Sequence, residues 1–251
     1  MELLESILLG IVQGLTEFLP VSSSGHLVLL EKAGFGKPDL FFNVMLHTGS
    51  LFAVILFYRK NVLALVRHPF RNGGPYYVWA MIPTGIMALL FDALASDALE
   101  GKYLPLGFMI TAAALVLAEC FRNSKIQTLS VKNSILTGVF QGIALFPGVS
   151  RSGLTLSALT LSGVERKTAA DFCFMLSIPV IALSAVYELI TVPFSEISVN
   201  PLNLAVGTAA SFLSSLVAVR FMTAFVKKHR LYVFSFYLVI AAAISFLTIR
   251  P

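Results

Sequence analysis

The sequence predicts an all-α, polytopic membrane protein with six transmembrane helices and two re-entrant helical hairpins, arranged as an inverted-topology repeat. Three observations lead to this prediction. Of 251 residues, 57% are hydrophobic and only 12% are charged, whereas soluble domains carry roughly 25% charged residues. Six apolar stretches are long enough to cross a bilayer, and two polar interruptions at membrane depth resemble each other. The composition favours a membrane protein because so few charges would not keep a core of this size dissolved.

The six long apolar stretches are the expected transmembrane helices, because a bilayer core requires roughly 20 residues of helix. They cover residues 40–58, 76–95, 103–121, 168–192, 201–226 and 231–249. Other apolar pieces are too short or too interrupted to span: 3–20 with its continuation 24–33, then 134–147, and 153–163. A Pro/Ser/Gly turn joins the pieces in each half. Such a turn is tolerated at membrane depth only inside protein or beside a watery cavity, so we expect one re-entrant hairpin in each half.

The basic residues predict how the chain is oriented in the membrane. Twelve of the 18 Lys and Arg lie in one set of loops: Arg59, Lys60, Arg67, Arg71, Arg122, Lys125, Lys132, Arg166, Lys167, Lys227, Lys228 and Arg230. The positive-inside rule makes these loops cytoplasmic and places both termini outside. Six crossings agree with this, because they return the chain to its starting side. Since orientation signals account for the net charge of +5, we expect no nucleic-acid partner.

An internal repeat links the two polar interruptions. GIVQGLTEFLPVSSSGH, residues 10–26, aligns without a gap with GVFQGIALFPGVSRSGL, residues 138–154. Identical residues occur at Gly10/Gly138, Gln13/Gln141, Gly14/Gly142, Phe18/Phe146, Val21/Val149, Ser22/Ser150, Ser24/Ser152 and Gly25/Gly153. We interpret the match as a duplication within a single transmembrane domain, 1–251, with repeats of about 1–125 and 126–251. An odd number of crossings in each repeat inverts the second, as in secondary transporters whose ligand sites lie at broken helices.

The two loops carry groups that suit a phosphorylated substrate. Each serine run begins a half-helix, and a helix N-terminus offers unpaired N–H groups and a partial positive charge to an anion. Arg151 adds a fork of donors that matches phosphate oxygens. Glu17, like Arg151, is costly in a membrane unless it is paired or functional, and His26 can carry a proton near neutral pH. Together these groups favour phosphoryl hydrolysis, with a divalent cation held by Glu17 and the phosphates.

Plainer interpretations of the same residues stay open. The serines would also serve as caps of half-helices. Glu17 and Arg151 would also form a structural ion pair between the repeats, and His26 would also be a hydrogen-bonded core histidine. Gln13 and its repeat counterpart would also bond the backbone across each hairpin. His47, within a transmembrane stretch, is expected to be structural.

At these residues the chain resembles the undecaprenyl-diphosphate phosphatase family of bacterial membranes, the bacitracin-resistance protein type. The family's first motif, Glu/Gln-x-x-x-Glu, is matched by Gln13 and Glu17, and its second, PGxSRSxxT, by residues 147–155. The segment FFNVMLHTGSLFAV, residues 41–54, is also similar, so the resemblance covers essentially the whole chain. One departure concerns Gln13, which leaves Glu17 as the only acid in the first loop.

The resemblance implies an enzyme of the bacterial cytoplasmic (inner) membrane that hydrolyses undecaprenyl diphosphate to undecaprenyl phosphate and inorganic phosphate. This reaction recycles the lipid carrier of cell-wall synthesis and confers bacitracin resistance. Glu17, His26 and Arg151 are the implied catalytic residues, Mg or Ca is the expected cation, and the family favours an active site open to the outer face. Around the diphosphate we expect Gln13, Ser22, Ser24, Ser150, Ser152 and Thr155.

The attacking group is either Ser23 or a water activated by His26 or Glu17, and the sequence does not separate these routes. A second function is also open, because inverted repeats with broken helices suit a transporter or flippase of polyprenyl phosphate. The convergence of Arg, His, Glu and Ser side chains favours the enzyme, since a transporter needs binding groups but no proton-transfer pair. Membrane lipids are the other expected partners, and the oligomeric state is not predicted.

Overall fold

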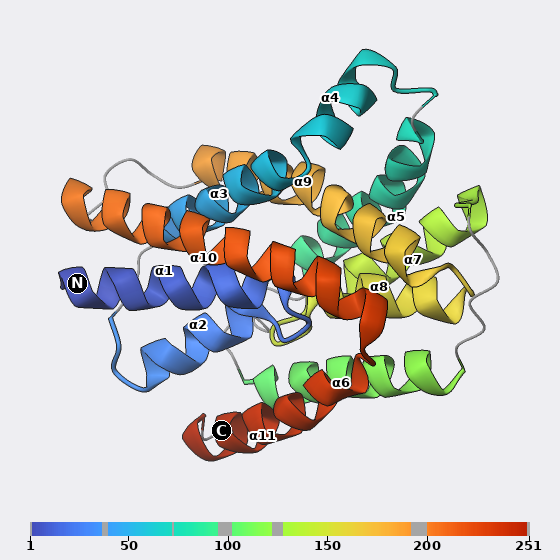
Figure 1. Ribbon diagram of the computed structural model, residues 1–251. Coiled ribbons are helices and arrows are strands. Elements are labelled where there is room, and N and C mark those ends of the chain that lie inside the picture. The colour runs from blue at the N-terminus through green and yellow to red at the C-terminus, as the bar shows by residue number, and fades with distance from the viewer. Residues whose placement is uncertain are drawn as a thin grey trace.

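The computed structural model describes residues 2–36, 40–71, 73–94, 102–121, 128–191 and 200–249. These residues form eleven α-helices, in agreement with the predicted all-α class (Figure 1). The first six are α1 (Leu3–Phe18), α2 (Ser23–Lys32), α3 (Leu40–Phe57), α4 (Arg59–Arg67), α5 (Gly74–Leu94) and α6 (Leu104–Cys120). The others are α7 (Val131–Ile143), α8 (Arg151–Leu161), α9 (Arg166–Thr191), α10 (Pro201–Lys228) and α11 (Tyr232–Thr248). Residues 95 and 192 of the predicted spans, and Arg122 and Lys125 of the basic set, lie outside the described residues.

Four helices are long and apolar enough to cross a membrane: α3, α5 within 74–91, α9 and α10. They correspond to four of the six predicted spans. The other two predicted spans are α6 and α11, which are apolar but have only 17 residues each. The protein is therefore a multi-pass membrane protein. The short helix α4, which carries Arg59, Lys60 and Arg67, differs from the sequence prediction, which has a loop at these residues.

The half-helices end and begin where local chemistry requires. α1 stops at Phe18, and Leu19 is extended (φ −70°, ψ 146°) because a residue before proline disfavours helical angles. In the second half, Gly148 adopts a positive φ of 82°, and a Cβ there would press against α6. Glycine is therefore the residue that this turn requires. The two breaks, 19–22 and 144–150, agree with the predicted interruptions.

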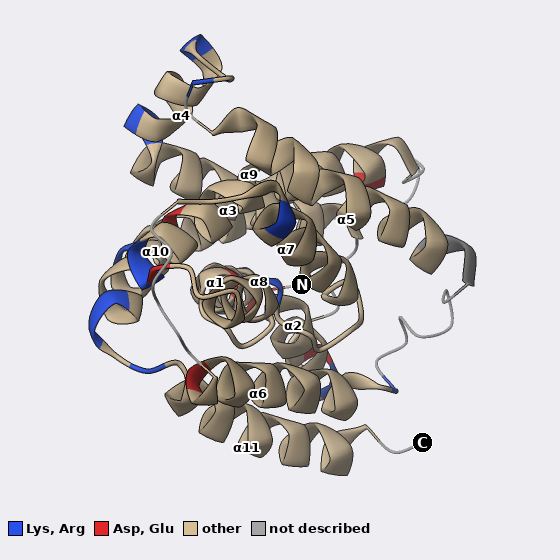
Figure 2. Cartoon of the chain, turned by 90° about the vertical axis from the view of Figure 1, so that its right-hand side faces the viewer, with Lys and Arg blue, Asp and Glu red and all other residues tan. Residues whose placement is uncertain are grey.

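Close helix packing surrounds the two half-helix pairs. α1 lies along α10, and α7 lies along α5. Gly10 packs against the carbonyl of Gly207, and Gly138 against the carbonyl of Ala80, so neither glycine has room for a side chain. α6 and α11 form a further pair. Figure 2 looks along α1 and α8, which lie in the middle of the other helices, and residues 152–160 of α8 are all buried.

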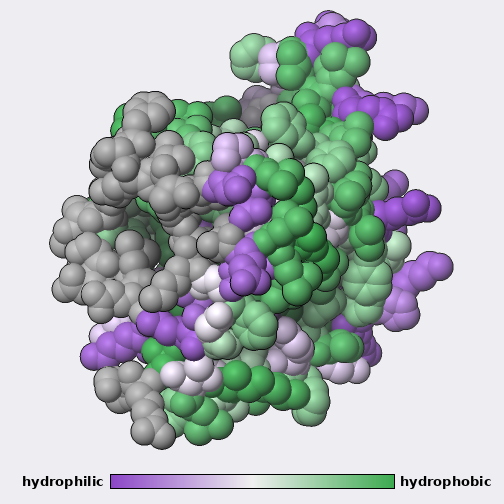
Figure 3. Space-filling model, turned by 90° about the vertical axis from the view of Figure 1, so that its left-hand side faces the viewer, coloured by the Kyte–Doolittle hydropathy of each residue, from purple (hydrophilic) through white to green (hydrophobic). Residues whose placement is uncertain are grey.

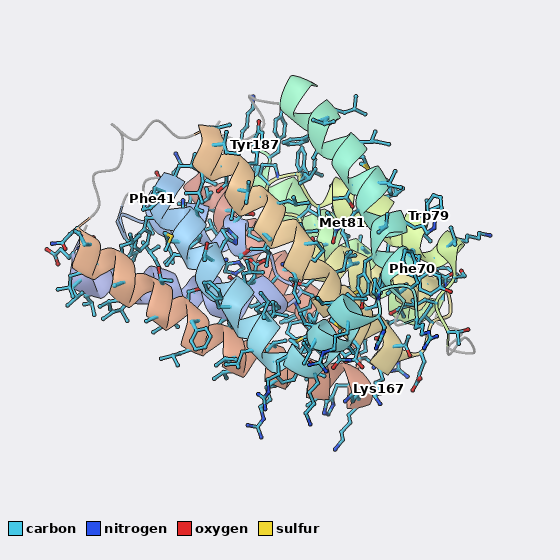
Figure 4. The ribbon with its side chains drawn as sticks, turned by 90° about the horizontal axis from the view of Figure 1, so that it is seen from above. Phe41, Phe70, Trp79, Met81, Lys167 and Tyr187 are labelled. Carbon is cyan, nitrogen blue, oxygen red and sulfur yellow. The ribbon has the colours of Figure 1, made fainter. Side chains whose placement is uncertain are left out.

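The surface matches a lipid environment. In Figure 3, apolar residues form broad continuous areas, whereas a soluble protein seldom exposes such patches. Leucine, isoleucine and phenylalanine side chains of α9 and α11 are among the most exposed, for example Ile190 (78%) and Phe236 (75%). In Figure 4, Phe41 at the start of α3 lies on the same side as Tyr187 near the end of α9, so these neighbouring helices run in opposite directions.

Candidate active site

Two helix N-termini meet in the middle of the molecule. Ser22 caps α2, where its Oγ accepts a hydrogen bond from the Gly25 N–H (3.3 Å). Ser150 caps α8 in the same way, with the Gly153 N–H as donor (3.1 Å). The Oγ of Ser152 donates to the carbonyl oxygen of Leu19 (2.9 Å) and so ties the second loop to the first. The capping role is confirmed for Ser22 and Ser150, and the N-termini of α2 and α8 leave unpaired N–H groups beside the joined loops.

The carboxylate of Glu17 lies where the two loops join. Its Oε1 accepts a hydrogen bond from Nη2 of Arg151. Its Oε2 accepts from Oγ of Ser23 (2.6 Å) and from Nε2 of Gln13 (3.0 Å). The Glu17 side chain is only 5% exposed and that of Arg151 16%. A charge this deeply buried is stable only when it is paired and hydrogen-bonded, and both oxygens of Glu17 meet that condition.

A histidine of α3 extends this network. Nδ1 of His47 lies 2.9 Å from Nε2 of Gln13 and 3.5 Å from Oε2 of Glu17. With the Gln13 amide nitrogen as the donor, Nδ1 of His47 accepts, and Nε2 carries the proton of the neutral ring. The Oε1 of Gln13 is buried and has no hydrogen-bond partner within the described part of the chain. Gln13 therefore holds both Glu17 and His47 in place from behind.

Glu17, His47 and Arg151 line a cavity of about 250 Å³. One wall carries the hydroxyls of the first serine run, Glu17, His47 and Arg151. The helix α9 contributes the apolar side chains Val180, Ile181 and Ala185 together with Ser184 and Glu188. The cationic, hydroxyl and backbone N–H donors suit an anion, and the apolar side chains of α9 suit the lipid part of an amphiphile. Chemically, the cavity can bind a phosphorylated lipid head group and can deprotonate a hydroxyl or a water.

Six of the ten predicted site residues line this cavity: Glu17, Ser22, Ser23, Ser24, Ser150 and Arg151. The other four are engaged elsewhere. Gln13 is fully buried behind Glu17, Ser152 bonds Leu19, and the Oγ1 of Thr155 donates to the carbonyl of Arg151 (2.8 Å). His26 points toward α6 and α11, where its ring contacts Phe108 and Tyr237.

Two ionisable residues of the cavity were missed. The sequence predicts a structural role for His47 and does not place Glu188 of α9 in the site, yet both line the cavity. Each lies inside a predicted span, 40–58 or 168–192. An ionisable side chain within a span is costly and marks function. That signal singled out Glu17 and Arg151, and it would also have found these two.

The cavity offers two carboxylates as candidate ligands for a divalent cation. Within the described ranges, no group of three or more His, Cys, Asp or Glu side chains could hold a metal ion. The carboxylates available in the cavity are Glu17 and Glu188. Mg²⁺ is commonly bound by one or two carboxylates plus substrate phosphates, whereas Ca²⁺ takes roughly six to eight oxygen ligands. The donor set therefore fits Mg²⁺ carried with a phosphate better than Ca²⁺ in a protein cage.

Fold and site together define a multi-pass membrane protein with a buried cavity for an anionic head group, built from two broken helices. Residues 6–244 match the family described as bacitracin resistance protein BacA, and the chain belongs to that family. It is 35% identical to the undecaprenyl-diphosphatase of Korarchaeum cryptofilum, over 96% of this chain and 97% of the relative. It is 37% identical to the undecaprenyl-diphosphatase of Carboxydothermus hydrogenoformans, over 93% and 92% of the two chains. The family that the loop motifs resemble is thereby confirmed.

Proposed function

We propose that the protein is an integral membrane phosphatase that hydrolyses undecaprenyl diphosphate to undecaprenyl phosphate and inorganic phosphate. The observation that carries the proposal is the meeting of Glu17, Ser23 and Arg151 at two helix N-termini in one cavity. The names of the two relatives, both undecaprenyl-diphosphatases, support undecaprenyl diphosphate as the substrate. In the cell, this reaction recycles the lipid carrier of cell-wall synthesis and protects against bacitracin.

Arg151 and the two helix N-termini bind the diphosphate. The contact with Glu17 uses Nη2 of the guanidinium, which has five N–H donors in a planar fork. The remaining donors face the phosphate oxygens, and the backbone N–H groups of α2 and α8 add further donors. These groups also stabilise the negative charge that develops as the phosphoryl group is transferred.

Ser23 is the proposed nucleophile and Glu17 the general base. At 2.6 Å, the Ser23 hydroxyl already donates to Glu17, which is the geometry of an activated nucleophile. The Ser23 oxygen attacks the terminal phosphorus, its proton passes to Glu17, and the bond to the bridging oxygen breaks. Glu17 gives this proton to the leaving undecaprenyl phosphate, which restores the carboxylate. A water deprotonated by Glu17 then hydrolyses the phosphoserine. The alternative, direct attack by such a water, uses the same carboxylate.

In this proposal Glu17 would hold Mg²⁺ together with the substrate phosphates. When bound, it would neutralise phosphate charge and polarise the phosphoryl oxygens. Arg151 and the N–H groups perform the same task from the protein side. A variant of Arg151 therefore tests the protein's own part in neutralising the phosphate charge.

The proposal includes an inverted repeat of six spans and two re-entrant hairpins. Helix bounds support it, because α1 and α7, α2 and α8, and α6 and α11 begin 128 residues apart. The related helices α3 and α9 run in opposite directions, as inversion requires (Figure 4). Basic residues of α4 and of the end of α10 lie on one side of the molecule (Figure 2). That side is cytoplasmic in the proposal, both termini are outside, and the membrane is the bacterial inner membrane.

Phosphate release from undecaprenyl diphosphate by the purified protein in detergent tests the function. We expect wild-type release and its loss in Arg151→Ala, while Arg67→Ala, a matched change on exposed α4, keeps the wild-type rate. Equal rates in all three proteins would refute the site. A flippase of polyprenyl phosphate would instead move lipid across sealed liposomes without releasing phosphate.

A further inference from the structure

His26 joins α2 to the C-terminal helix α11. Its Nδ1 lies 2.7 Å from the carbonyl oxygen of Ser22, and its Nε2 lies 2.6 Å from the hydroxyl of Tyr237. The planes of the two rings differ by only 6°, and Phe108 of α6 packs edge-on against the imidazole with ring centres 5.6 Å apart. Both ring nitrogens are therefore engaged, and neither His26 nor Tyr237 is among the described residues that line the cavity.

These two contacts determine where the proton of the imidazole lies. A backbone carbonyl can only accept, so Nδ1 of His26 carries the proton and donates to Ser22. In the neutral ring, Nε2 is then the acceptor, and the Tyr237 hydroxyl donates to it. The hydroxyl of Tyr237 thus favours the one tautomer that can hold the Ser22 carbonyl.

The carbonyl that His26 holds belongs to the turn that presents Ser23. Ser22 has a φ of 71°, and it is the only non-glycine residue with a positive φ in the described ranges. Such a conformation persists only where surrounding contacts enforce it. Because the peptide unit is planar and trans, a fixed Ser22 carbonyl also fixes the Ser23 N–H, which points the opposite way. The position of the Ser23 hydroxyl beside Glu17 follows from the same peptide.

We propose that Tyr237 is a positioning residue for the hydrolysis and that it acts through His26. Its hydroxyl holds the imidazole in the tautomer that fixes the Ser22 carbonyl, and this turn aims Ser23 at the substrate phosphorus. The inference rests on the proposed function and gives His26 a positioning task in place of proton transfer. It also gives α11, which contributes no side chain to the cavity lining, a part in the reaction.

Steady-state phosphate release from undecaprenyl diphosphate by the purified full-length protein tests the inference. Tyr237→Phe removes only the hydroxyl, so we expect kcat to fall about 2- to 10-fold, the range of one net hydrogen bond. The KM should change by less than about 2-fold, because the donors that bind the substrate are untouched. Tyr232→Phe is the matched control, an exposed tyrosine on the same helix, and should keep the wild-type kcat.

A double-variant comparison tests whether Tyr237 acts through His26. In a His26→Leu background, Tyr237→Phe should cause no further loss of kcat, because contacting groups that act in series are not additive. A wild-type kcat in Tyr237→Phe, or the same fold-loss in both backgrounds, would overturn the inference.

Two replacements of His26 separate positioning from proton transfer. The amide nitrogen of Asn reaches the place of Nδ1 and still donates to the Ser22 carbonyl, whereas that of Gln reaches the place of Nε2. We expect the kcat of His26→Asn to be about 2 to 10 times that of His26→Gln, because Asn keeps one neutral hydrogen bond to the Ser22 carbonyl. A proton carrier would instead lose about 10²- to 10⁴-fold in both variants, which would overturn the positioning role. Absence of phosphate release by the wild-type protein would refute the proposed function itself.

Discussion

Glu17→Gln keeps the size of the side chain and removes its charge. The carboxylate accepts hydrogen bonds from Arg151, Ser23 and Gln13, but an amide presents only one oxygen. At least one bond to a charged group, worth about 1.5–3 kcal/mol, is therefore lost. Breaking a fully buried ion pair costs about 3–5 kcal/mol. Because Arg151 is 16% exposed toward the cavity, water compensates in part, and we expect the free energy of unfolding to fall by about 2–3 kcal/mol.

Activity should fall much further than stability. Loss of the general base lowers kcat by about 10²- to 10⁴-fold, measured as phosphate release in detergent. The double variant Glu17→Gln/Arg151→Met removes both charges, and an apolar replacement of a buried ion pair is often neutral for stability. Thermal unfolding of the double variant should therefore return toward the wild-type temperature while activity stays lost. Recovery of activity along with stability, or a kcat within about 5-fold of wild type in Glu17→Gln, would show that the pair is only structural.

Three further predictions concern packing and orientation. Gly14→Ala should destabilise the protein by about 1–3 kcal/mol, because a Cβ would press into α10. Gly85→Ala is the control, because a Cβ at Gly85 meets open space. Equal thermal unfolding temperatures of the two variants would contradict this prediction. Glu119→Ala should lower the free energy of unfolding by about 2–3 kcal/mol, because Nη2 of Arg166 loses both carboxylate oxygens while Nη1 keeps its backbone carbonyl partners. An unchanged midpoint of thermal or denaturant unfolding would argue against it. Ser24→Cys, in a cysteine-free background, should react with a membrane-impermeant maleimide added outside intact cells, whereas labelling only after permeabilisation would place the cavity mouth inside.

The half-helices could be predicted because their breaks are encoded locally. Pro20 disfavours a helical Leu19, and a serine run supplies the cap that starts the next helix. The predicted pieces 3–20 and 153–163 differ from α1 and α8 by two residues at their ends. α4 was missed for a physical reason. Its nine residues are amphipathic and basic, and they are too few and too polar to be recognised as a transmembrane span.

The centre of the site could be predicted from the cost of burying charge. Glu17 and Arg151 are hard to accommodate in a membrane singly, and the structure pairs them. The same cost marks His47 as a candidate, but it does not say which histidine lies beside Glu17. His26 is adjacent to the serine run in sequence, whereas His47 reaches Glu17 only because α3 packs beside α1. That neighbour relation is tertiary, and no local pattern specifies it.

The orientation of the His26 side chain could not be predicted from the sequence for the same reason. The imidazole is four residues from Ser22 on one helical turn, so its Nδ1 reaches the Ser22 carbonyl locally. The partner of its other nitrogen is Tyr237, more than two hundred residues away in the chain. Only the arrangement of α2 beside α11 brings these two side chains together.

The most direct test of the central claim compares wild-type protein and Ser23→Ala in one assay of phosphate release from undecaprenyl diphosphate, with acid quenching and mass spectrometry of the Ser23 peptide. The proposed mechanism predicts release by the wild type, loss of release in Ser23→Ala, and a phosphate on Ser23 in the quenched wild-type protein. Wild-type rates in Ser23→Ala, with no phosphorylated Ser23 at any quench time, would contradict it.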